Sequence, residues 1–447
     1  MMKKTLFTLN LLMLSPFCFA LNLIEAYDRA KNTDPAWQAN IYQFEADQTN
    51  LGIARSYLLP TVTVSGNITR KNQDTQDSSA GGPAAPGSPN LVTSSSTAKQ
   101  AAVTLRQPLF QMDKWLNYKR TKTTLALGDV TLKLQKQQHM LNVAEAYFNV
   151  LRQQTLTLTN TQEEAALLQQ LKMMNAKLRE GLVARSDVSE ANAQYENARA
   201  NRIATGVQLI LAQEQLAQLI GPYKDKLAVL RDDFKYQKPI PSSLKEWVNL
   251  AESQNLDVLQ ARLQLKHADD QRKVEQAARL PQIDAVATYG YMEQKPETAI
   301  SSNGQFDQVG VEMYWNMFAG GRTQASVNKA KINVKKSDSQ LDAVLRKATT
   351  DVKKSYMQVE TDQSTLQARK TAMESSALVA KASKAQYNEG LKSIVDVLLA
   401  QRNSFATKQQ YVNTQFDYII NVLRLKAAIG QLNEAELLQI NAWLTYK

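Results

Sequence analysis

Four short segments of the chain alternate between apolar and polar residues, and this period of two predicts β-strands. In the first segment, Val62, Val64 and Ile68 alternate with threonine, serine and asparagine, and in the last Val311 and Met313 alternate with polar residues. The expected strands cover about 61–70, 101–110, 282–291 and 308–318. Taken alone, these segments fit the wall of a membrane barrel and a half-buried hairpin of a soluble sheet equally well.

Most of the remaining chain has the spacing of coiled-coil helices, as in Met140, Ala144, Tyr147 and Leu151. The longest such patterns run for about 67 residues, which at a rise of about 1.5 Å per residue gives a helix of roughly 100 Å. The expected helices cover about 113–179, 187–219, 322–386 and 395–428, with one of roughly 23 residues before Pro60 and another before Pro281.

The chain contains two copies of one plan. The segment EGLVARSDVSEA, which begins at Glu180, is matched 209 positions later by EGLKSIVDVLLA, which begins at Glu389, with six of twelve residues identical. Each copy combines two strands, a long helix, a glycine turn and a shorter helix. In the simplest packing the short helices stack beside the long one, so that the glycine turns lie about 100 Å from the strands.

This plan predicts the division of the chain. The expected parts are a signal peptide at 1–20, a first repeat at 21–221, a linker at 222–242, a second repeat at 243–430 and a C-terminal periplasmic segment at 431–447. Residues 71–100 are mostly serine, threonine, glycine, proline and other small or polar residues, so we expect a mobile loop there. Residues 292–307 are its shorter counterpart.

The beginning of the chain has the pattern of a secretory signal peptide. Lys3 and Lys4 precede an apolar run that ends at Phe17, and we expect cleavage after Ala20 without lipidation, although Cys18 lies nearby. The remaining chain then has no cysteine, which excludes disulfides and thiolate metal sites and suits a periplasmic or outer-membrane protein. No later apolar run is long enough for a transmembrane helix, so an inner-membrane protein is excluded.

Charge and motifs argue against nucleic-acid binding and catalysis. The 53 basic and 42 acidic residues are mixed along the chain, so the net charge of +11 indicates solvated helix faces and no nucleic-acid partner. No phosphate loop, nucleophile elbow or zinc signature is present in the sequence. We expect His139 and His267, the only histidines, to be ordinary helix-surface residues, and we expect no catalytic residues, no metal and no cofactor.

Four strands are too few to close a membrane barrel, since the smallest such barrels have about eight. If the strands cross a membrane, the protein must therefore oligomerise, with each chain giving a third or a similar fraction of one barrel and one helical tube. Arg106, Asp284 and Glu312 fall on the polar faces of the strands, where a water-filled lumen tolerates charge, and Trp315 lies among apolar residues as an interfacial residue does.

The whole arrangement resembles the TolC family of outer-membrane efflux and secretion channels. The likeness rests on the LP pairs that end at Pro60 and Pro281, the strand endings QPLF and WNMFAGGR, and the turns GLVARSDV and GLKSIVDVLLAQ, in this order along the chain. The resemblance implies a mainly α fold with a transmembrane β-barrel portion: a homotrimer whose twelve-stranded barrel, four strands per chain, continues into a long periplasmic α-helical coiled-coil barrel. Such a trimer would sit in outer-membrane lipid and passively conduct drugs, proteins or both from an inner-membrane RND, ABC or MFS transporter and a periplasmic adaptor.

The resemblance also assigns roles to the two glycine turns, as the closed inner tips of the tunnel. Docking of the adaptor would involve the residues Gly181, Leu182, Gly390 and Leu391. Tyr387 and Lys392 would link across the tip to Ser186 and Asp187, and Asp396 would form a ring of three carboxylates in the constriction. The family's usual basic residue is arginine where this chain has Lys392, so the planar, bidentate link is lost here.

Two alternatives remain open from the residues themselves. Ser393 followed by Asp396, and Asp187 followed by Glu190, both fit helix capping boxes, so the aspartates have a structural explanation beside the functional one. The chief rival function is a structural coiled-coil protein or adhesin stalk without a conduit, which would not need paired strands behind helix-breaking prolines.

Overall fold

The structure is a computed structural model that describes residues 20–76, 91–231, 234, 236, 239–296 and 301–446, without the side chains of 73–76, 91–94 and 296. Apart from Ala20, the expected signal peptide lies outside the described residues. The chain divides into two compact units. The helical unit comprises Met1–Tyr42, Thr131–Leu259 and Val344–Lys447, and the strand unit comprises Gln43–Val130 and Gln260–Ala343.

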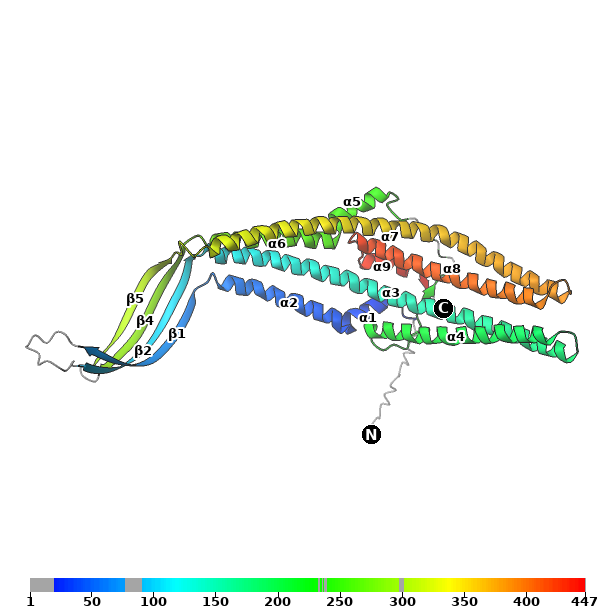
Figure 1. Cartoon of the computed structure of the whole chain (residues 1–447), viewed down its shortest axis with the longest axis horizontal. Coiled ribbons are helices and arrows are strands. Elements are labelled where there is room, and N and C mark those ends of the chain that lie inside the picture. Colours follow the sequence, from blue (N-terminus) through cyan, green and yellow to red (C-terminus); the bar gives the residue numbers. More distant parts are fainter. Residues whose placement is uncertain are drawn as a thin grey trace, which may run out of the picture. The chain divides into compact units, whose positions relative to one another are not determined.

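Figure 1 labels the elements. The helices are α1 (Leu23–Thr33), α2 (Pro35–Ser56), α3 (Met112–Arg179), α4 (Arg185–Ile220), α5 (Leu244–Gln254), α6 (Leu256–Ala277), α7 (Arg322–Asn388), α8 (Ile394–Ala428) and α9 (Glu434–Asn441). The strands are β1 (Thr61–Gln76), β2 (Leu91–Phe110), β3 (Val229–Leu230), β4 (Gln282–Pro296), β5 (Ser302–Tyr314) and β6 (Leu444–Thr445).

The strand unit contains an antiparallel sheet with the order β1-β2-β4-β5. Val64 pairs with Val103, and Val103 pairs with Tyr289 on its other side, so the apolar residues of neighbouring strands share one face. The apolar face is exposed in the chain: Val64 keeps 77% of its accessible surface and Val309 keeps 83%. A β-sheet that leaves one apolar face uncovered needs a partner for that face, whether another part of a protein or lipid.

The expected loop over 71–100 is wrong in its described parts, because β1 continues to Gln76 and β2 begins at Leu91. Residues 77–90 lie outside the described residues. The strand pairing explains the difference, since the backbone groups of 91–100 pair with β1, and those of 96–100 also pair with β4, whatever the side chains are. The expected end of the last strand at 318 is also wrong: β5 ends at Tyr314, and Trp315 follows it with its indole N–H donating to the carbonyl of Arg279 (3.0 Å).

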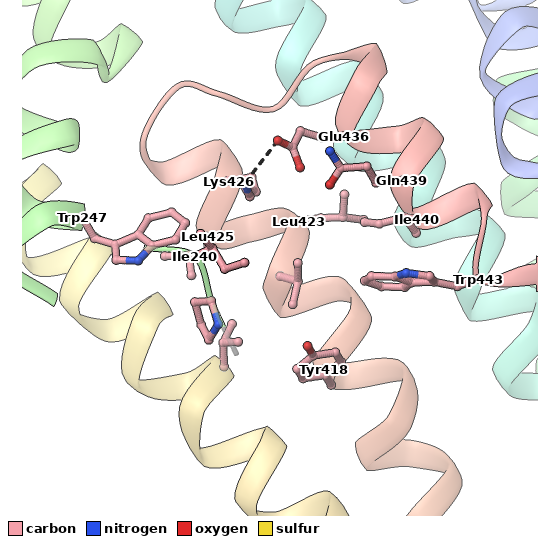
Figure 2. A pocket seen from close by; sticks show the side chains of 13 residues that line it. Ile240, Trp247, Tyr418, Leu423, Leu425, Lys426, Glu436, Gln439, Ile440 and Trp443 are labelled. Carbon is pink, nitrogen blue, oxygen red and sulfur yellow. Dashed lines mark hydrogen bonds and ion pairs between the residues drawn. The ribbon is translucent and has the colours of Figure 1, made fainter. Parts of the chain in front are cut away.

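Three short helices of the helical unit, α1, α5 and α9, were not expected from the sequence. Helix α5 is anchored by Trp247, which is buried and donates its indole N–H to the Pro241 carbonyl (2.6 Å). Helix α9 is tied to α8 by the ion pair between Lys426 and Glu436 (3.1 Å), which Figure 2 shows. Each short helix is held by its side chains more than by its own few hydrogen bonds, as helices of this length require.

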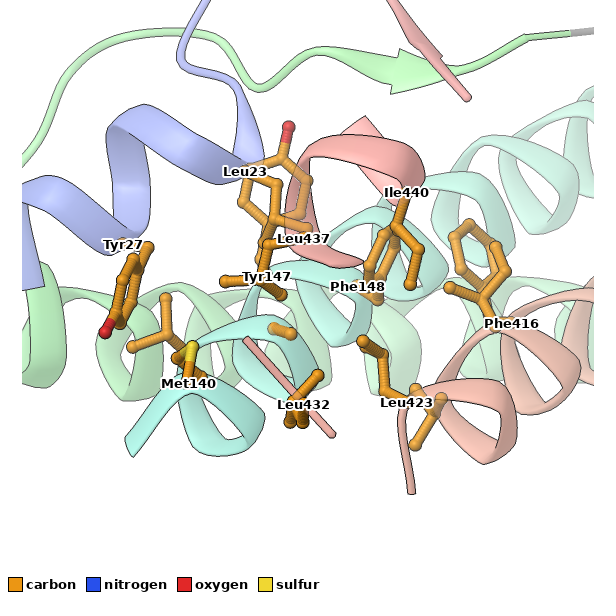
Figure 3. Close-up of a cluster of buried hydrophobic side chains, with 14 of the residues drawn as sticks. Leu23, Tyr27, Met140, Tyr147, Phe148, Phe416, Leu423, Leu432, Leu437 and Ile440 are labelled. Atoms are coloured by element: carbon orange, nitrogen blue, oxygen red, sulfur yellow. The ribbon is translucent and has the colours of Figure 1, made fainter. Parts of the chain in front are cut away.

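The core of the helical unit joins α1, α3, α4, α5, α7, α8 and α9. Figure 3 shows Tyr27, Tyr147, Phe148, Phe416 and Leu423 packed together, and all five are almost fully buried. Aromatic and branched side chains of this size bury the most apolar surface per residue, and each contributes roughly 1.5–3 kcal/mol of burial free energy.

Tyr147 also links three distant parts of the chain by its hydroxyl group. That group lies 3.0 Å from the carbonyl oxygen of Leu21 and 2.9 Å from that of Ala228. Leu21 forms a parallel bridge with Leu227, and β3 pairs with β6 near the end of the chain. The first described residues, the 222–242 segment and the C-terminal segment therefore meet around one buried side chain.

The two glycine turns have the same backbone structure. After α3, the N–H of Gly181 donates to Leu178 O and that of Leu182 donates to Lys177 O. After α7, Gly390 and Leu391 repeat both bonds, with partners 209 positions further along the chain. This is the Schellman motif, which requires one residue in the left-handed backbone conformation. Gly181 and Gly390 adopt it, with φ of 73° and 78°.

His139 is buried, which corrects the expectation of an ordinary surface residue. Its Nε2 lies 3.1 Å from Asp34 Oδ2, and its ring stacks on Trp37 with the centroids 5.3 Å apart. Burial lowers the pKa of His139, and the Asp34 carboxylate opposes this effect without cancelling it. The sequence could not reveal the burial, because Asp34 and Trp37 lie more than 100 positions away from His139.

The lowered pKa of His139 makes stability depend on pH. The unfolded imidazole, with a pKa near 6.5, takes up a proton more readily than the folded one. The contribution of the neutral, buried His139 to the free energy of unfolding is therefore complete above about pH 6.5 and is lost as the pH falls. Burial raises the pKa of the neighbouring Tyr27, so its phenol stays neutral in this range. We expect the melting temperature of His139→Gln to change less between pH 7.5 and 5.5 than that of the unaltered protein. If calorimetry showed the same change of melting temperature with pH for both proteins, this prediction would be contradicted.

The glycine turns give a second prediction, with a matched control in the same unit. A methyl group at Gly390 meets no atom within 4 Å, so Gly390→Ala tests the backbone conformation alone, and we expect a loss of about 1 kcal/mol. Gly206, inside α4, has equally open surroundings and helical geometry, so Gly206→Ala should stabilise by about 0.5–1 kcal/mol. Chemical denaturation of both variants measures the difference. If both substitutions changed the free energy of unfolding in the same direction, the left-handed turn would not require glycine.

Candidate functional site

Three charged side chains meet on the polar face of the sheet. Arg106 on β2 contacts Asp284 on β4 (Nη1 to Oδ2, 3.0 Å) and Glu312 on β5 (Nη2 to Oε2, 2.9 Å). Gln111 adds an amide hydrogen bond to the second carboxylate oxygen of Asp284. The sequence predicted that these three residues share a polar face, and the structure brings them together into one cluster with two acids to one base.

The two glycine turns lie over one small hydrophobic cluster. Its buried members come from three of the four helices that the turns join, and Tyr387 on α7 packs against them. These buried residues are Leu167, Met174, Ala191, Ala198, Ile394, Val397 and Leu398. The residues at the turns themselves are solvent-exposed: Leu182 keeps 67% of its accessible surface and Leu391 keeps 76%. The two turns therefore expose two leucine side chains next to the same hydrophobic cluster.

Asp396 is part of a helix-capping box in the structure, with Ser393 as the N-cap residue. The hydroxyl of Ser393 accepts a bond from the Asp396 N–H, and the Asp396 carboxylate accepts bonds from the Ser393 hydroxyl (2.7 Å) and N–H (3.1 Å). These bonds hold the pKa of Asp396 below its ordinary value, so the exposed carboxylate is ionised at neutral pH. The expected capping box is thus confirmed here, and it leaves the carboxylate charged at the surface of the turn.

Asp187 has a different place from the one expected. Its predicted capping box with Glu190 is wrong, because α4 begins two residues before Asp187, at Arg185. Asp187 is instead the third residue of the helix, and its carboxylate accepts the N–H of Ala184 (3.3 Å). The aligned position in the second turn is Asp396, which does the same for Ser393. The sequence-based interpretation put Asp187 at the N-cap position and Asp396 at the third helical position, although the repeat aligns the two aspartates.

Tyr387 and Lys392 make contacts within the chain that the sequence did not predict. Lys177 Nζ lies 3.2 Å from the Tyr387 hydroxyl and 4.5 Å from its ring centroid, and Lys392 Nζ donates to Ser383 Oγ (3.1 Å). Among the described residues of this one chain, neither is paired with Ser186 or Asp187, and their expected link across the tip stays a prediction. Lys177 is a residue that the sequence analysis missed. The available signal was its place in the last helical turn before Gly181, like that of Tyr387 before Gly390.

No group of three or more histidine, cysteine, aspartate or glutamate side chains in the described ranges is arranged to hold a metal ion. None of the helices in that part of the chain is both long and apolar enough to cross a membrane.

Comparisons with known proteins agree with one another. The chain is 32% identical over 457 aligned positions to outer membrane protein TolC of Escherichia coli (strain K12), across 98% of this chain and 89% of that one. It is 26% identical to alkaline protease secretion protein AprF of Pseudomonas aeruginosa, across 97% and 89% of the two chains.

Solved structures share the fold. The Campylobacter jejuni CmeC outer membrane channel superposes with a TM-score of 0.77 over 95% of this chain and 89% of that chain, at 16% identity. A family model described as outer membrane efflux protein matches residues 26–222 and 247–431. These matches cover most of both repeats, and the chain therefore belongs to the outer membrane efflux protein family.

Proposed function

We propose that the chain is one subunit of a homotrimeric channel in the outer membrane, which serves as the exit duct of a tripartite efflux pump, a type I secretion system or both. Membership in the outer membrane efflux protein family and the full-length likeness to TolC support this proposal. The name of AprF concerns secretion of a protease, whereas the matching family model is described as outer membrane efflux protein, so the proposal includes both secretion and efflux.

The four-stranded sheet is the observation that carries the proposal. Within the part of the chain that the structure describes, its outer strands, β1 and β5, each have a neighbour on one side only, and its exposed apolar face suits lipid. Two copies would give eight strands, and a barrel of that size is filled by its own side chains. Three copies give twelve strands and a water-filled lumen, into which Arg106, Asp284 and Glu312 would project.

The glycine turns would form the closed inner tip of this duct. In a trimer, Asp396 would contribute three carboxylates to a ring, and their mutual repulsion in a water-like medium would be weak enough to tolerate. Tyr387 and Lys392 would reach Ser186 and Asp187 across the tip and hold it shut. Exposed links of this kind contribute about 0–1 kcal/mol each, so a binding partner could open them.

That partner would be a periplasmic adaptor docked on the turns. Leu182 and Leu391 are the exposed apolar side chains there, and Gly181 and Gly390 beside them lack side chains that would obstruct a close approach. An inner-membrane transporter of the RND, ABC or MFS class would supply the energy. The duct itself needs no catalytic residue, cofactor or metal for passive conduction.

The proposal is tested by assembly and conductance. Native mass spectrometry of the detergent-extracted protein should give a trimer, and planar bilayers should give a small conductance. Lys392→Ala removes the bond to Ser383 and the proposed link, so we expect the conductance to rise severalfold. Lys384→Ala, an exposed lysine in the last turns of α7, is the control and should leave conductance unchanged. A monomer, or a folded trimer without conductance, would refute the duct.

The charge at the tip gives a separate prediction. Asp396→Asn keeps an oxygen that can accept the Ser393 N–H, so the cap is retained while the ring of charge is lost. We expect a severalfold drop in the cation-over-anion permeability ratio, measured from reversal potentials in a salt gradient. Asp257→Asn, an exposed aspartate in the first turn of α6, removes the same charge elsewhere and should have no effect. An unchanged ratio in Asp396→Asn would place this carboxylate outside the constriction.

A further inference from the structure

A cavity in the helical unit has no part in conduction as proposed above. It has a volume of about 120 Å³ and lies between α5, α7, α8 and α9, beside the segment that leads into α5. Figure 2 shows its labelled lining residues, with Trp247 on one side and Trp443 on the other. The remaining lining comes from Pro239, Ile240, Val359, Tyr418, Val422, Leu423, Leu425, Lys426, Glu436, Gln439 and Ile440.

The walls are apolar and held firmly in place. Trp247 is buried and fixed by its hydrogen bond to Pro241, while Trp443 packs on Phe234 with the ring centroids 4.5 Å apart. Leu423 and Tyr418 are buried as well, and they belong to the main core. A rigid apolar wall keeps a cavity open when it would otherwise collapse, and a cavity of about 150 Å³ with aliphatic and aromatic walls is known to admit benzene.

The polar groups stand at one edge of the cavity. Lys426 and Glu436 neutralise one another at 3.1 Å, and Lys426 Nζ also lies 5.8 Å from the Trp247 ring centroid. The Gln439 side chain is solvent-exposed and has no hydrogen bond within the described part of the chain. A charged ligand would have to compete with the ion pair, whereas a neutral one needs only an amide partner.

We propose that this cavity is a binding site for a small, neutral molecule with one aromatic ring and one hydroxyl or amide group. The volume admits a single ring, the tryptophans supply flat apolar walls, and Gln439 offers both a donor and an acceptor at the open edge. A bound ring would contact α5, α8 and α9 together and so stabilise the packing of the short helices on α8. The proposal does not depend on the duct.

Phenol is the probe that tests the site. The full-length protein in detergent is titrated with phenol, with tryptophan fluorescence and saturation-transfer NMR as readouts and with empty micelles as the blank. We expect saturable binding, and at least tenfold weaker binding of benzoate, because its charge must be desolvated beside Glu436. Absence of saturation above the blank, or equal binding of benzoate, would overturn the proposal.

Three variants locate the bound probe. Val422→Phe fills the cavity and should abolish binding, while Leu438→Phe enlarges an exposed residue of α9 and should leave binding unchanged. Gln439→Leu changes an exposed side chain, so it should fold normally even if Val422→Phe does not. It should weaken phenol binding threefold to tenfold and leave toluene binding unchanged. Undiminished phenol binding by Gln439→Leu, or by a folded Val422→Phe, would refute the assignment.

Discussion

The hydrogen-bonding groups at the two edges of the four-stranded sheet constrain everything else in this protein. Among the described residues, strands β1 and β5 each leave one side without a neighbouring strand. A hydrocarbon environment supplies no partners for such groups, and each buried unpaired group costs several kcal/mol. A chain with an exposed apolar sheet face and two open edges therefore cannot be complete alone in a membrane. In the proposed trimer, pairing between identical copies would satisfy both edges without any additional sequence.

The two glycine turns that connect the helices share one backbone arrangement. Both turns end a long helix with a left-handed glycine, and in both an aspartate in the first turn of the next helix accepts a hydrogen bond from the backbone N–H of the residue just before that helix. Capping and function are therefore not competing explanations for Asp396. The hydrogen bonds that cap the helix also lower the pKa of this carboxylate, and so they preserve the charge that the proposed ring requires.

Local patterns in the sequence predicted the long helices, the strand pairs and the repeat, because period and turn chemistry are written in neighbouring residues. Contacts between distant residues were not accessible in this way. His139 was misjudged because its partner Asp34 lies between α1 and α2, 105 positions away, and Lys177 was missed because Tyr387 lies 210 positions away. The described parts of the 71–100 segment, 71–76 and 91–100, were misjudged because β1 and β2 pair with one another there and residues 96–100 also pair with β4, against the preference of their own composition.

The two hydrophobic clusters of the helical unit differ in a way that suits a duct with a movable tip. The cluster around Tyr147 gathers many large side chains from the N-terminal, middle and C-terminal parts of the chain, so opening it would expose much apolar surface. The cluster under the turns has seven buried residues, two of them alanines, and its nearby links are single contacts such as Lys392 to Ser383. Free energies of local opening follow the apolar surface that is lost, so the turns should open long before the main core does. The proposed gate requires this difference, because opening the turns must leave the main core of the helical unit folded.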